Sequence, residues 1–291
     1  MLTATAPAKL NLTLEVLGRR DDGYHEIRSV VQAIDLGDRL TFEATGATEV
    51  SCTMPGWNAE ESLVMRAVDV VSEATGSDRG VTIEIEKRIP LMSGLGGDSS
   101  DAAAVLLALD RLWQLGLSPE KLHELAARLG SDVPFFLGGG TALMAGRGER
   151  LTPLPSPAAT WAVVVVPPVP RGPGKTAHAY GRLEASDFTG GEQTERLAAT
   201  LRSGGSLAGE PLFNAFERSA FAEVNRLVEC RDAMLAASGT EGSAVHLAGS
   251  GPGLFAVVAD RPAAEALCSD LKRRGLRAYL TATRDRGVVL E

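Results

Sequence analysis

The sequence predicts a globular protein of mixed helices and strands, arranged in two domains. The chain has 291 residues, and about 150 residues is typical of one domain. Strand-like alternation and helix-like periodicity both occur before residue 150, and both start again after residue 160. Between them, the segment 152–157 contains three prolines in six residues, which is typical of a stiff linker. We therefore expect one domain over residues 1–155 and a second over residues 156–291.

The net charge of the chain limits its partners. Lysine and arginine number 29 and aspartate and glutamate 37, which gives a net charge of −8 at pH 7. Such a molecule repels phosphate backbones and anionic membranes, so we expect a small-molecule ligand and no nucleic-acid or membrane partner. An anionic ligand would need a local site built from backbone N–H groups or from a few well-placed cations.

The cysteines and the apolar segments predict a cytoplasmic protein. Cys52, Cys230 and Cys268 are odd in number, far apart and without a C-x-x-C pair, so we expect neither a disulfide framework nor a zinc site. The N-terminus lacks the basic start and long apolar run of a leader, and the apolar run 161–166 stops at two prolines. The four histidines show no metal-ligand spacing, so a dedicated transition-metal site is not expected.

The first half of the chain begins with patterns of both kinds. Apolar residues at positions 10, 12, 14 and 16 alternate with polar ones, which predicts a half-buried strand with Lys9 and Asn11 on its polar face. A turn is expected at residues 21–23, and mixed apolar segments follow to about residue 42. A helix is expected over residues 62–75, and alternation at Val81, Ile83 and Ile85 predicts a second strand over residues 81–86.

Two more helices are expected before the linker. Apolar residues at positions 105, 106, 109, 112 and 113 form the stripe of a buried helix over residues 99–115. Ser118, Pro119 and Glu120 provide an N-cap, a first-turn proline and a favourable charge for the next helix. Gly130 ends that helix at a C-cap position.

The second half of the chain repeats this mixture of patterns. It predicts a buried strand over residues 161–166 and mostly helix over residues 212–237. A strand, a glycine loop and another strand are expected over residues 245–259, followed by a helix over 262–274 and a last strand over 276–282. These elements form a second unit of helices and strands.

The segment 90–104 has the clearest functional pattern in the chain. It places Gly94, Gly96 and Gly97 in a turn between a strand and the start of a long helix. The free N–H groups of a first helical turn bind anions such as phosphate, and glycines let the backbone approach them closely. Ser99 and Ser100 add hydroxyl donors or a ligand for Mg²⁺. The alternative is a tight turn with a serine cap.

Other glycine motifs fit the sequence less well. The segment 90–104 is not a Rossmann motif, because Ser99 replaces the third glycine, and no Gly-Lys-Ser/Thr ends it as in a Walker A motif. A second segment, residues 172–176, does end in Gly-Lys-Thr, but Val169 stands where the first glycine is required. Prolines at positions 170 and 173 also remove N–H donors. We therefore do not expect a phosphate loop there.

Three further segments contain candidate functional residues, and each segment has both a functional and a purely structural interpretation. Tyr24 and His25 lie among carboxylates on a turn, where they could stack on a base and hydrogen bond to its edge, or form an ordinary polar turn. Asp132 could cap a helix or act as a carboxylate base. The glycine loop over residues 248–255 could be a hairpin or a wall that closes on a ligand.

Taken together and in this order, the segments 8–12, 90–104 and 248–255 resemble the three motifs of the GHMP kinases, which bind ATP on a glycine–serine loop. The resemblance covers nearly the whole chain and is least informative over residues 183–210. It implies an α+β fold in two domains, one like domain 2 of ribosomal protein S5 at the N-terminus and one ferredoxin-like at the C-terminus. The segments 22–26 and 129–135 resemble the branch that transfers the γ-phosphoryl group of ATP to the 2-hydroxyl of a CDP-linked methylerythritol alcohol, in the non-mevalonate route to isoprenoid precursors.

The resemblance also implies a catalytic pair and a cofactor site. Lys9 and Asp132 match the catalytic pair, in which the aspartate takes or orients the hydroxyl proton and the lysine keeps the aspartate ionised. ATP, together with Mg²⁺, is expected to bind at Pro90, Leu91, Met92, Ser93, Gly94, Leu95, Gly96, Gly97, Asp98, Ser99 and Ser100. The ligands of the metal are not identified by the sequence.

Substrate contacts follow from the same resemblance. Asn11, Tyr24 and His25 match substrate-binding positions, with Tyr24 on the face of the cytosine and His25 at its edge. A second stacking aromatic is expected after the first strand of the C-terminal domain, and Tyr180 is the candidate.

The sequence departs from the family pattern in two places. Asp98 stands where the family usually has a small residue, most often glycine. A carboxylate aimed at phosphates would repel them, so we expect Asp98 to cap or precede the helix, where its charge is favourable, with a ligand role toward Mg²⁺ as the alternative. The asparagine expected on the adenine side, near residues 61–63, is also missing.

Two alternative functions follow from the same motifs. The chain could be another GHMP kinase that acts on homoserine or a mevalonate-type alcohol, although these substrates carry no base for Tyr24 to stack on. It could also be a non-catalytic nucleotide-binding protein of this fold, against which the presence of both Lys9 and Asp132 argues. We expect a monomer or a weak homodimer.

Overall fold

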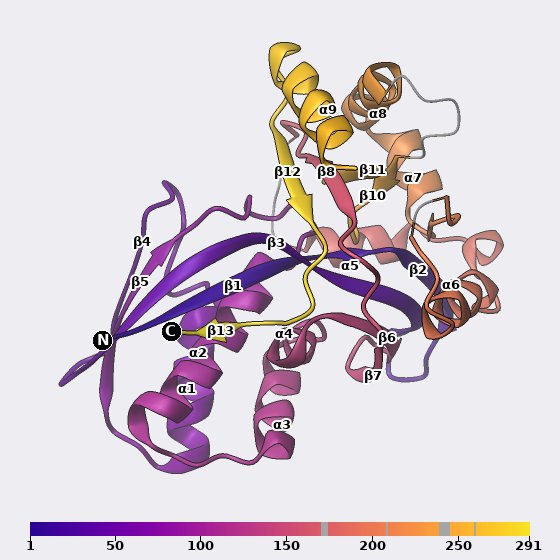
Figure 1. The fold of residues 1–291 in the computed structure, drawn as a ribbon. Coiled ribbons are helices and arrows are strands. Elements are labelled where there is room, and N and C mark those ends of the chain that lie inside the picture. Colours follow the sequence, from indigo (N-terminus) through magenta and orange to yellow (C-terminus); the bar gives the residue numbers. More distant parts are fainter. Residues whose placement is uncertain (170–173, 208, 239–244, 259) are drawn as a thin grey trace.

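The computed structural model describes residues 1–169, 174–207, 209–238, 245–258 and 260–291. These residues form a mixed α+β fold with two β-sheets (Figure 1). The first sheet has the strand order β13-β1-β3-β2-β9, with β5 and β6 also paired to β3, β4 paired to β5 and β7 to β6. The second sheet has the order β10-β11-β8-β12.

The first sheet is built around β3 (His25–Thr45), which pairs with β1, β2, β5 and β6. Its other strands are β1 (Leu2–Asn11), β2 (Thr13–Arg19), β4 (Glu49–Cys52), β5 (Gly80–Glu86), β6 (Thr141–Gly146), β7 (Arg150–Leu154), β9 (Phe213–Asn214) and β13 (Val289–Leu290). One face packs through a shared apolar core on α1 (Leu63–Thr75), α2 (Gly97–Trp113), α3 (Pro119–Leu129) and α4 (Val133–Gly138).

The second sheet consists of β8 (Trp161–Val165), β10 (His246–Leu247), β11 (Leu254–Val258) and β12 (Ala278–Ala282). One face packs on α8 (Asn225–Ser238) and α9 (Arg261–Arg273), and the opposite face packs on β1 and β3 of the first sheet. The remaining helices are α5 (Lys175–Gly181), a 3-10 turn (Ala185–Asp187), α6 (Glu192–Arg202) and α7 (Glu217–Glu223). The two sheets therefore share a core in which β1 is central.

Most predicted elements are confirmed. Helix α1 begins after Ser62, whose side chain accepts a hydrogen bond from the Met65 amide, and α3 begins after Ser118 in the same way. Strands β5, β8 and β12 and helix α9 lie where the periodicity placed them. The long helix begins two residues earlier than predicted, because Gly96 adopts a left-handed conformation with φ 75° and the helix starts at the next residue.

The strand predicted over residues 10–16 is wrong in two respects. The chain forms two strands, β1 and β2, because the paired register with β3 ends at Asn11 and resumes at Glu15, although the Leu12 amide still donates to the Val30 carbonyl at 2.8 Å. There the amide of Val30 donates to the side chain of Thr13 at 2.9 Å instead of to a strand carbonyl. Both faces are buried, since Lys9 and Asn11 are only 5% and 4% exposed. The shared face of Lys9 and Asn11 is confirmed, but it lies in the interior.

The second half differs from the prediction at its ends. Residues 152–154 belong to β7, so the proline-rich segment is only partly a linker. The region predicted as mostly helix begins with strand β9, and β13 follows the last predicted strand and pairs with β1. Residue 259, the predicted end of a strand, lies outside the described residues. The division at residue 155 stays a prediction, with β9 and β13 joining the first sheet from beyond it.

Among the described residues, no helix is both long enough and apolar enough to cross a membrane.

Candidate active site

The predicted site residues gather around one cavity of about 1070 Å³. Its wall includes the catalytic and substrate candidates and most of the segment 90–100. Leu95 and Ser100 are the exceptions: both are fully buried, and neither lines the cavity. The lining contains Lys9, Asn11, Tyr24, His25, Pro90, Leu91, Met92, Ser93, Gly94, Gly96, Gly97, Asp98, Ser99, Asp132 and Tyr180.

Lys9 and Asp132 form an ion pair on the cavity wall. The Lys9 Nζ atom lies 3.3 Å from Asp132 Oδ2 and donates to Asn11 Oδ1 at 2.6 Å. The Asn11 amide in turn donates to Ser29 Oγ at 2.8 Å, so the side chain that positions the Lys9 amine is itself fixed by a hydrogen bond. Asp132 takes the N-cap position of α4 without a side-chain cap bond, and its side chain is 36% exposed. Of the two interpretations of Asp132, this geometry favours the available carboxylate.

The glycine loop lies directly against Lys9. Gly96 has φ +75°, and a Cβ atom there would lie 3.1 Å from Lys9 Cγ and 2.8 Å from the ring of Phe136. Gly94 has φ +84°, and its Cβ would collide with the carbonyl oxygen of Ala248. Residues without a side chain are therefore required at both positions, which brings the start of α2 close to the lysine and to the 248–253 loop.

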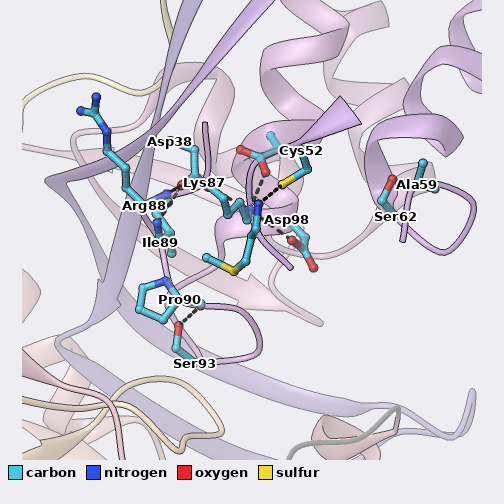
Figure 2. A network of polar contacts seen from close by, with 12 residues as sticks. Asp38, Cys52, Ala59, Ser62, Lys87, Arg88, Ile89, Pro90, Ser93 and Asp98 are labelled. Carbon is cyan, nitrogen blue, oxygen red and sulfur yellow. Dashed lines mark hydrogen bonds and ion pairs between the residues drawn. The ribbon is translucent and has the colours of Figure 1, made fainter. Parts of the chain in front are cut away.

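A buried charge cluster lies behind the glycine loop, and the sequence analysis missed it. Figure 2 shows the Lys87 amine between Asp38 and Asp98. Its Nζ atom lies 2.5 Å from Asp101 Oδ2, 2.8 Å from Asp38 Oδ2 and 3.3 Å from Asp98 Oδ1. A signal was present: Val81, the first apolar residue of the β5 pattern, has the same parity as Lys87, which places this lysine on the buried face.

Burial and charge act in opposite directions on this cluster. Burial alone would lower the pKa of Lys87, but the carboxylates of Asp101, Asp38 and Asp98 raise that pKa above its usual value. Burial raises the pKa of Asp101 well above the usual range of a carboxyl, although the charge of Lys87 opposes the shift. Asp38 also accepts from the amides of Arg88 and Ile89, at 2.6 and 2.7 Å. These two hydrogen bonds satisfy oxygen Oδ1 of a carboxylate that is buried from water.

Aromatic side chains also line the cavity. His25 stacks on Tyr180, with ring centroids 4.7 Å apart and an interplanar angle of 21°. Tyr24 is 54% exposed, and the guanidinium of Arg147 lies 4.6 Å from its ring centroid. Burial, assisted by the charge of Arg19, lowers the pKa of His25. Burial and then the charge of Asp132 raise the pKa of Tyr180.

The Gly-Lys-Thr segment also reaches the cavity. The structure describes it from Gly174, and residues 172 and 173 lie outside the described residues. Lys175 Nζ donates to the carbonyls of Met92, at 3.2 Å, and Gly251. The Thr176 hydroxyl lies 3.3 Å from Ser250 Oγ. The segment therefore contacts both glycine loops, residues 90–97 and 248–253, through its side chains. The spacing of a phosphate-loop motif does not predict such contacts.

The cavity is locally positive in a chain of net charge −8. Such a local excess of cations is what an anionic ligand requires here. Its charged lining consists of Lys9, Arg19, Lys87, Arg147 and Lys175 against Asp98 and Asp132. Within the described parts of the chain, no group of three or more histidine, cysteine or carboxylate side chains is arranged to hold a metal ion.

Comparison with known proteins identifies the class to which this fold and site belong. Residues 62–140 match the GHMP kinase N-terminal domain. A crystal structure of 4-(cytidine 5'-diphospho)-2C-methyl-D-erythritol kinase matches with a TM-score of 0.81 and 37% identity, over 97% of this chain and 98% of that chain. The homoserine kinase of Cytophaga hutchinsonii matches with a TM-score of 0.75 at 19% identity, which shows a common fold alone.

Relatives in sequence define the family more narrowly. A 4-diphosphocytidyl-2-C-methyl-D-erythritol kinase of Dehalococcoides mccartyi is 48% identical over 283 residues, 97% of this chain and 98% of the relative. One from Symbiobacterium thermophilum is 41% identical over 279 residues, 95% of this chain and 97% of the relative. The chain belongs to the 4-diphosphocytidyl-2-C-methyl-D-erythritol kinase family.

Proposed function

We propose that this protein transfers the γ-phosphoryl group of ATP to the 2-hydroxyl of 4-diphosphocytidyl-2-C-methyl-D-erythritol. The observation that carries the assignment of roles is the placement of Lys9 and Asp132 on one cavity wall, against the glycine loop at the start of α2. This arrangement puts a base and a cation beside the N–H groups of a first helical turn, which favour phosphate.

Asp132 acts as the general base in this proposal. Its carboxylate accepts the proton of the 2-hydroxyl, the hydroxyl oxygen attacks the γ-phosphorus, and the bond from that phosphorus to the bridging oxygen of ADP breaks. Lys9, held by Asn11, keeps Asp132 ionised and offsets charge on the transferring group. Phosphoryl transfer depends mainly on positioning and charge stabilisation, so the loop contributes alongside the base.

Mg²⁺ is part of the proposal, and the loop offers oxygens that suit it. Ser99 lines the cavity and offers a hydroxyl oxygen there. Ser100 Oγ has no hydrogen-bond partner among the described residues, but it is fully buried and does not line the cavity. Hydroxyl oxygens together with ATP phosphates form a ligand set that Mg²⁺ accepts. When bound beside Ser99, the ion would supply positive charge that offsets the negative charge of the phosphates.

The part of the cavity wall formed by Tyr24, His25 and Tyr180 is assigned to the cytosine. Arg147 covers one face of the Tyr24 ring, so we assign the base to the other face of this exposed ring. His25 and Tyr180, stacked on each other, form the adjoining wall. A cytoplasmic location and a monomer or weak homodimer complete the proposal, and the three free cysteines support a reducing compartment.

A coupled ADP-release assay tests this function. The purified protein is given ATP and Mg²⁺ with the CDP-linked methylerythritol, homoserine or mevalonate in separate reactions. We expect ADP only with the first alcohol, and a phosphorus–carbon coupling to the tertiary carbon C2 of the product, which locates the new phosphate at the 2-hydroxyl. ADP with homoserine or mevalonate would favour the alternative kinases. ATP binding without ADP from any of the alcohols would favour the non-catalytic alternative.

A further inference from the structure

Asp98 places a carboxylate beside the glycine loop, at the start of α2. It lies in the first turn of α2, its side chain is 49% exposed, and it lines the same cavity as Gly96 and Ser99. The prediction that Asp98 caps or precedes the helix is wrong, because Gly96 is the N-cap and Asp98 lies inside the first turn. Its negative charge is still favourable at this helix N-terminus. The same position brings one negative charge close to any polyphosphate that the loop binds.

Lys87 does not cancel this charge. Its amine lies closer to Asp101 and Asp38, at 2.5 and 2.8 Å, than to Asp98, at 3.3 Å. With Asp101 ionised, the lysine and these three carboxylates sum to −2, and with Asp101 protonated they sum to −1. In either state the cluster beneath the loop is net negative, so the single charge of Lys87 does not neutralise Asp98 together with its nearer partners.

The loop is seated directly on this cluster. A Cβ atom on Gly97 would lie 3.3 Å from Lys87 Nζ and 3.0 Å from the side chain of Ile89. The first turn of α2 is therefore in contact with the cluster, and Asp98 in this turn stays close to the charges of the cluster. Lys175 donates to the Met92 carbonyl on the same loop. Its positive charge keeps the surroundings of the loop attractive to anions.

We propose that Asp98 is a specificity residue that makes the nucleotide site discriminate against bare ATP in favour of ATP complexed with a divalent cation. The inference rests on the proposed function, because it takes the loop to be the ATP site. Repulsion scales with ligand charge. Since the cation cancels two of the roughly four negative charges of ATP, Asp98 opposes the bare nucleotide about twice as strongly as the complex.

Binding calorimetry without the alcohol substrate tests this proposal. Affinities for ATP with EDTA and for ATP with excess Mg²⁺ are measured at low ionic strength for the wild type, Asp98→Asn and Asp98→Gly. We expect both variants to bind bare ATP about tenfold more tightly and the magnesium complex about threefold more tightly, an approximate scaling with ligand charge. The difference should shrink at about 1 M salt, where the screening length is about 3 Å.

Asp69→Asn is the matched control. Asp69 is an exposed residue of α1 that does not line the cavity, and its replacement changes the net charge by the same amount. We expect it to change neither affinity. Thermal unfolding of each variant confirms that the fold is intact, and the glycine variant provides a second reading if the asparagine variant is unstable.

The results separate this proposal from the function on which it rests. Equal changes for bare and complexed ATP, or the same change in Asp69→Asn, would overturn the role of Asp98 while leaving the kinase assignment in place. Weaker binding of the magnesium complex alone would also overturn it, because Asp98 would then be a metal ligand. A wild-type protein that binds neither form of ATP would overturn the proposed function and, with it, this inference.

Discussion

Lys9 and Lys87 differ in what surrounds them, although both side chains are nearly buried at the same cavity. Lys9 lies 3.3 Å from a single carboxylate, Asp132, whose side chain is 36% exposed. Lys87 pairs with Asp101 and Asp38, whose side chains are 1% and 0% exposed, and less closely with the exposed Asp98. The first pair presents a carboxylate to a ligand, whereas Asp101 and Asp38 in the second group are sealed from one.

This difference in exposure assigns a catalytic role to the Lys9–Asp132 pair and a structural role to the Lys87 cluster. A general base must reach the proton that it removes, which Asp132 can do and Asp101 cannot. A buried lysine with several carboxylates is instead a structural group, because the loss of one charge leaves the others unpaired in the interior. The comparison predicts that changes at the first pair affect turnover and changes at the second affect stability.

The largest expected effect is on turnover in Asp132→Asn. Loss of the base should lower kcat by about 10²- to 10⁴-fold, the range for a general base, with ATP affinity and thermal stability close to wild type. Steady-state ADP release, calorimetry with ATP and thermal unfolding measure the three quantities. Asp69→Asn is again the charge-matched control. A kcat within about threefold of wild type would remove Asp132 from the mechanism.

Lys87→Met should act on stability. Removing the amine leaves Asp38 charged and buried, so we expect the free energy of unfolding to fall by about 3–5 kcal/mol, as measured by denaturant titration. The control is Arg128→Met, which breaks an ion pair with Glu73 whose side chains are 41% and 71% exposed. That change should cost at most about 1 kcal/mol. If the two variants lose similar stability, the Lys87 cluster is not sealed from water.

The two lysines also show which features of the site the sequence could predict. Alternation placed Lys9 and Asn11 on one face correctly, and the resemblance to a family supplied the pairing with Asp132, which alternation along one strand cannot provide. The same alternation rule, continued for one step beyond Ile85, places Lys87 on the buried face. Its partners could not be predicted, because Asp38 comes from β3 and Asp101 from α2, which meet only in the tertiary structure.

Two elements were missed for different reasons. Strand β13 is formed by Val289 and Leu290, and its partners Ala4 and Thr5 lie at the other end of the chain, where a local pattern has no access to them.

Helix α6 did carry a local signal. Its buried residues Thr194, Leu197, Ala198 and Leu201 have the spacing of one helix face, although the helix falls in the region with the weakest family resemblance. Only its partners needed the tertiary structure, since Thr194 bonds to Glu15 and Thr13 of β2.

The smallest expected effect concerns His25, which stacks on Tyr180 in the wall of the same cavity. Burial and the charge of Arg19 lower its pKa below the usual value of 6.5. His25 is therefore neutral at pH 7 and gains a proton only at more acid pH. In the same acid window the unfolded chain binds more protons than the folded one, so stability falls as the pH is lowered below 6.5.

Binding of the CDP-linked alcohol should follow this titration. If the neutral ring contacts the base, the affinity is constant from pH 8 to 6.5 and then falls, by about twofold where half of His25 is protonated. Calorimetry without ATP measures the affinity, and the proton resonances of the His25 ring report its titration. His25→Gln should flatten the profile, whereas His123→Gln, at an exposed position of α3, should leave it unchanged. An acid-side fall that persists in His25→Gln would assign the pH dependence to another group.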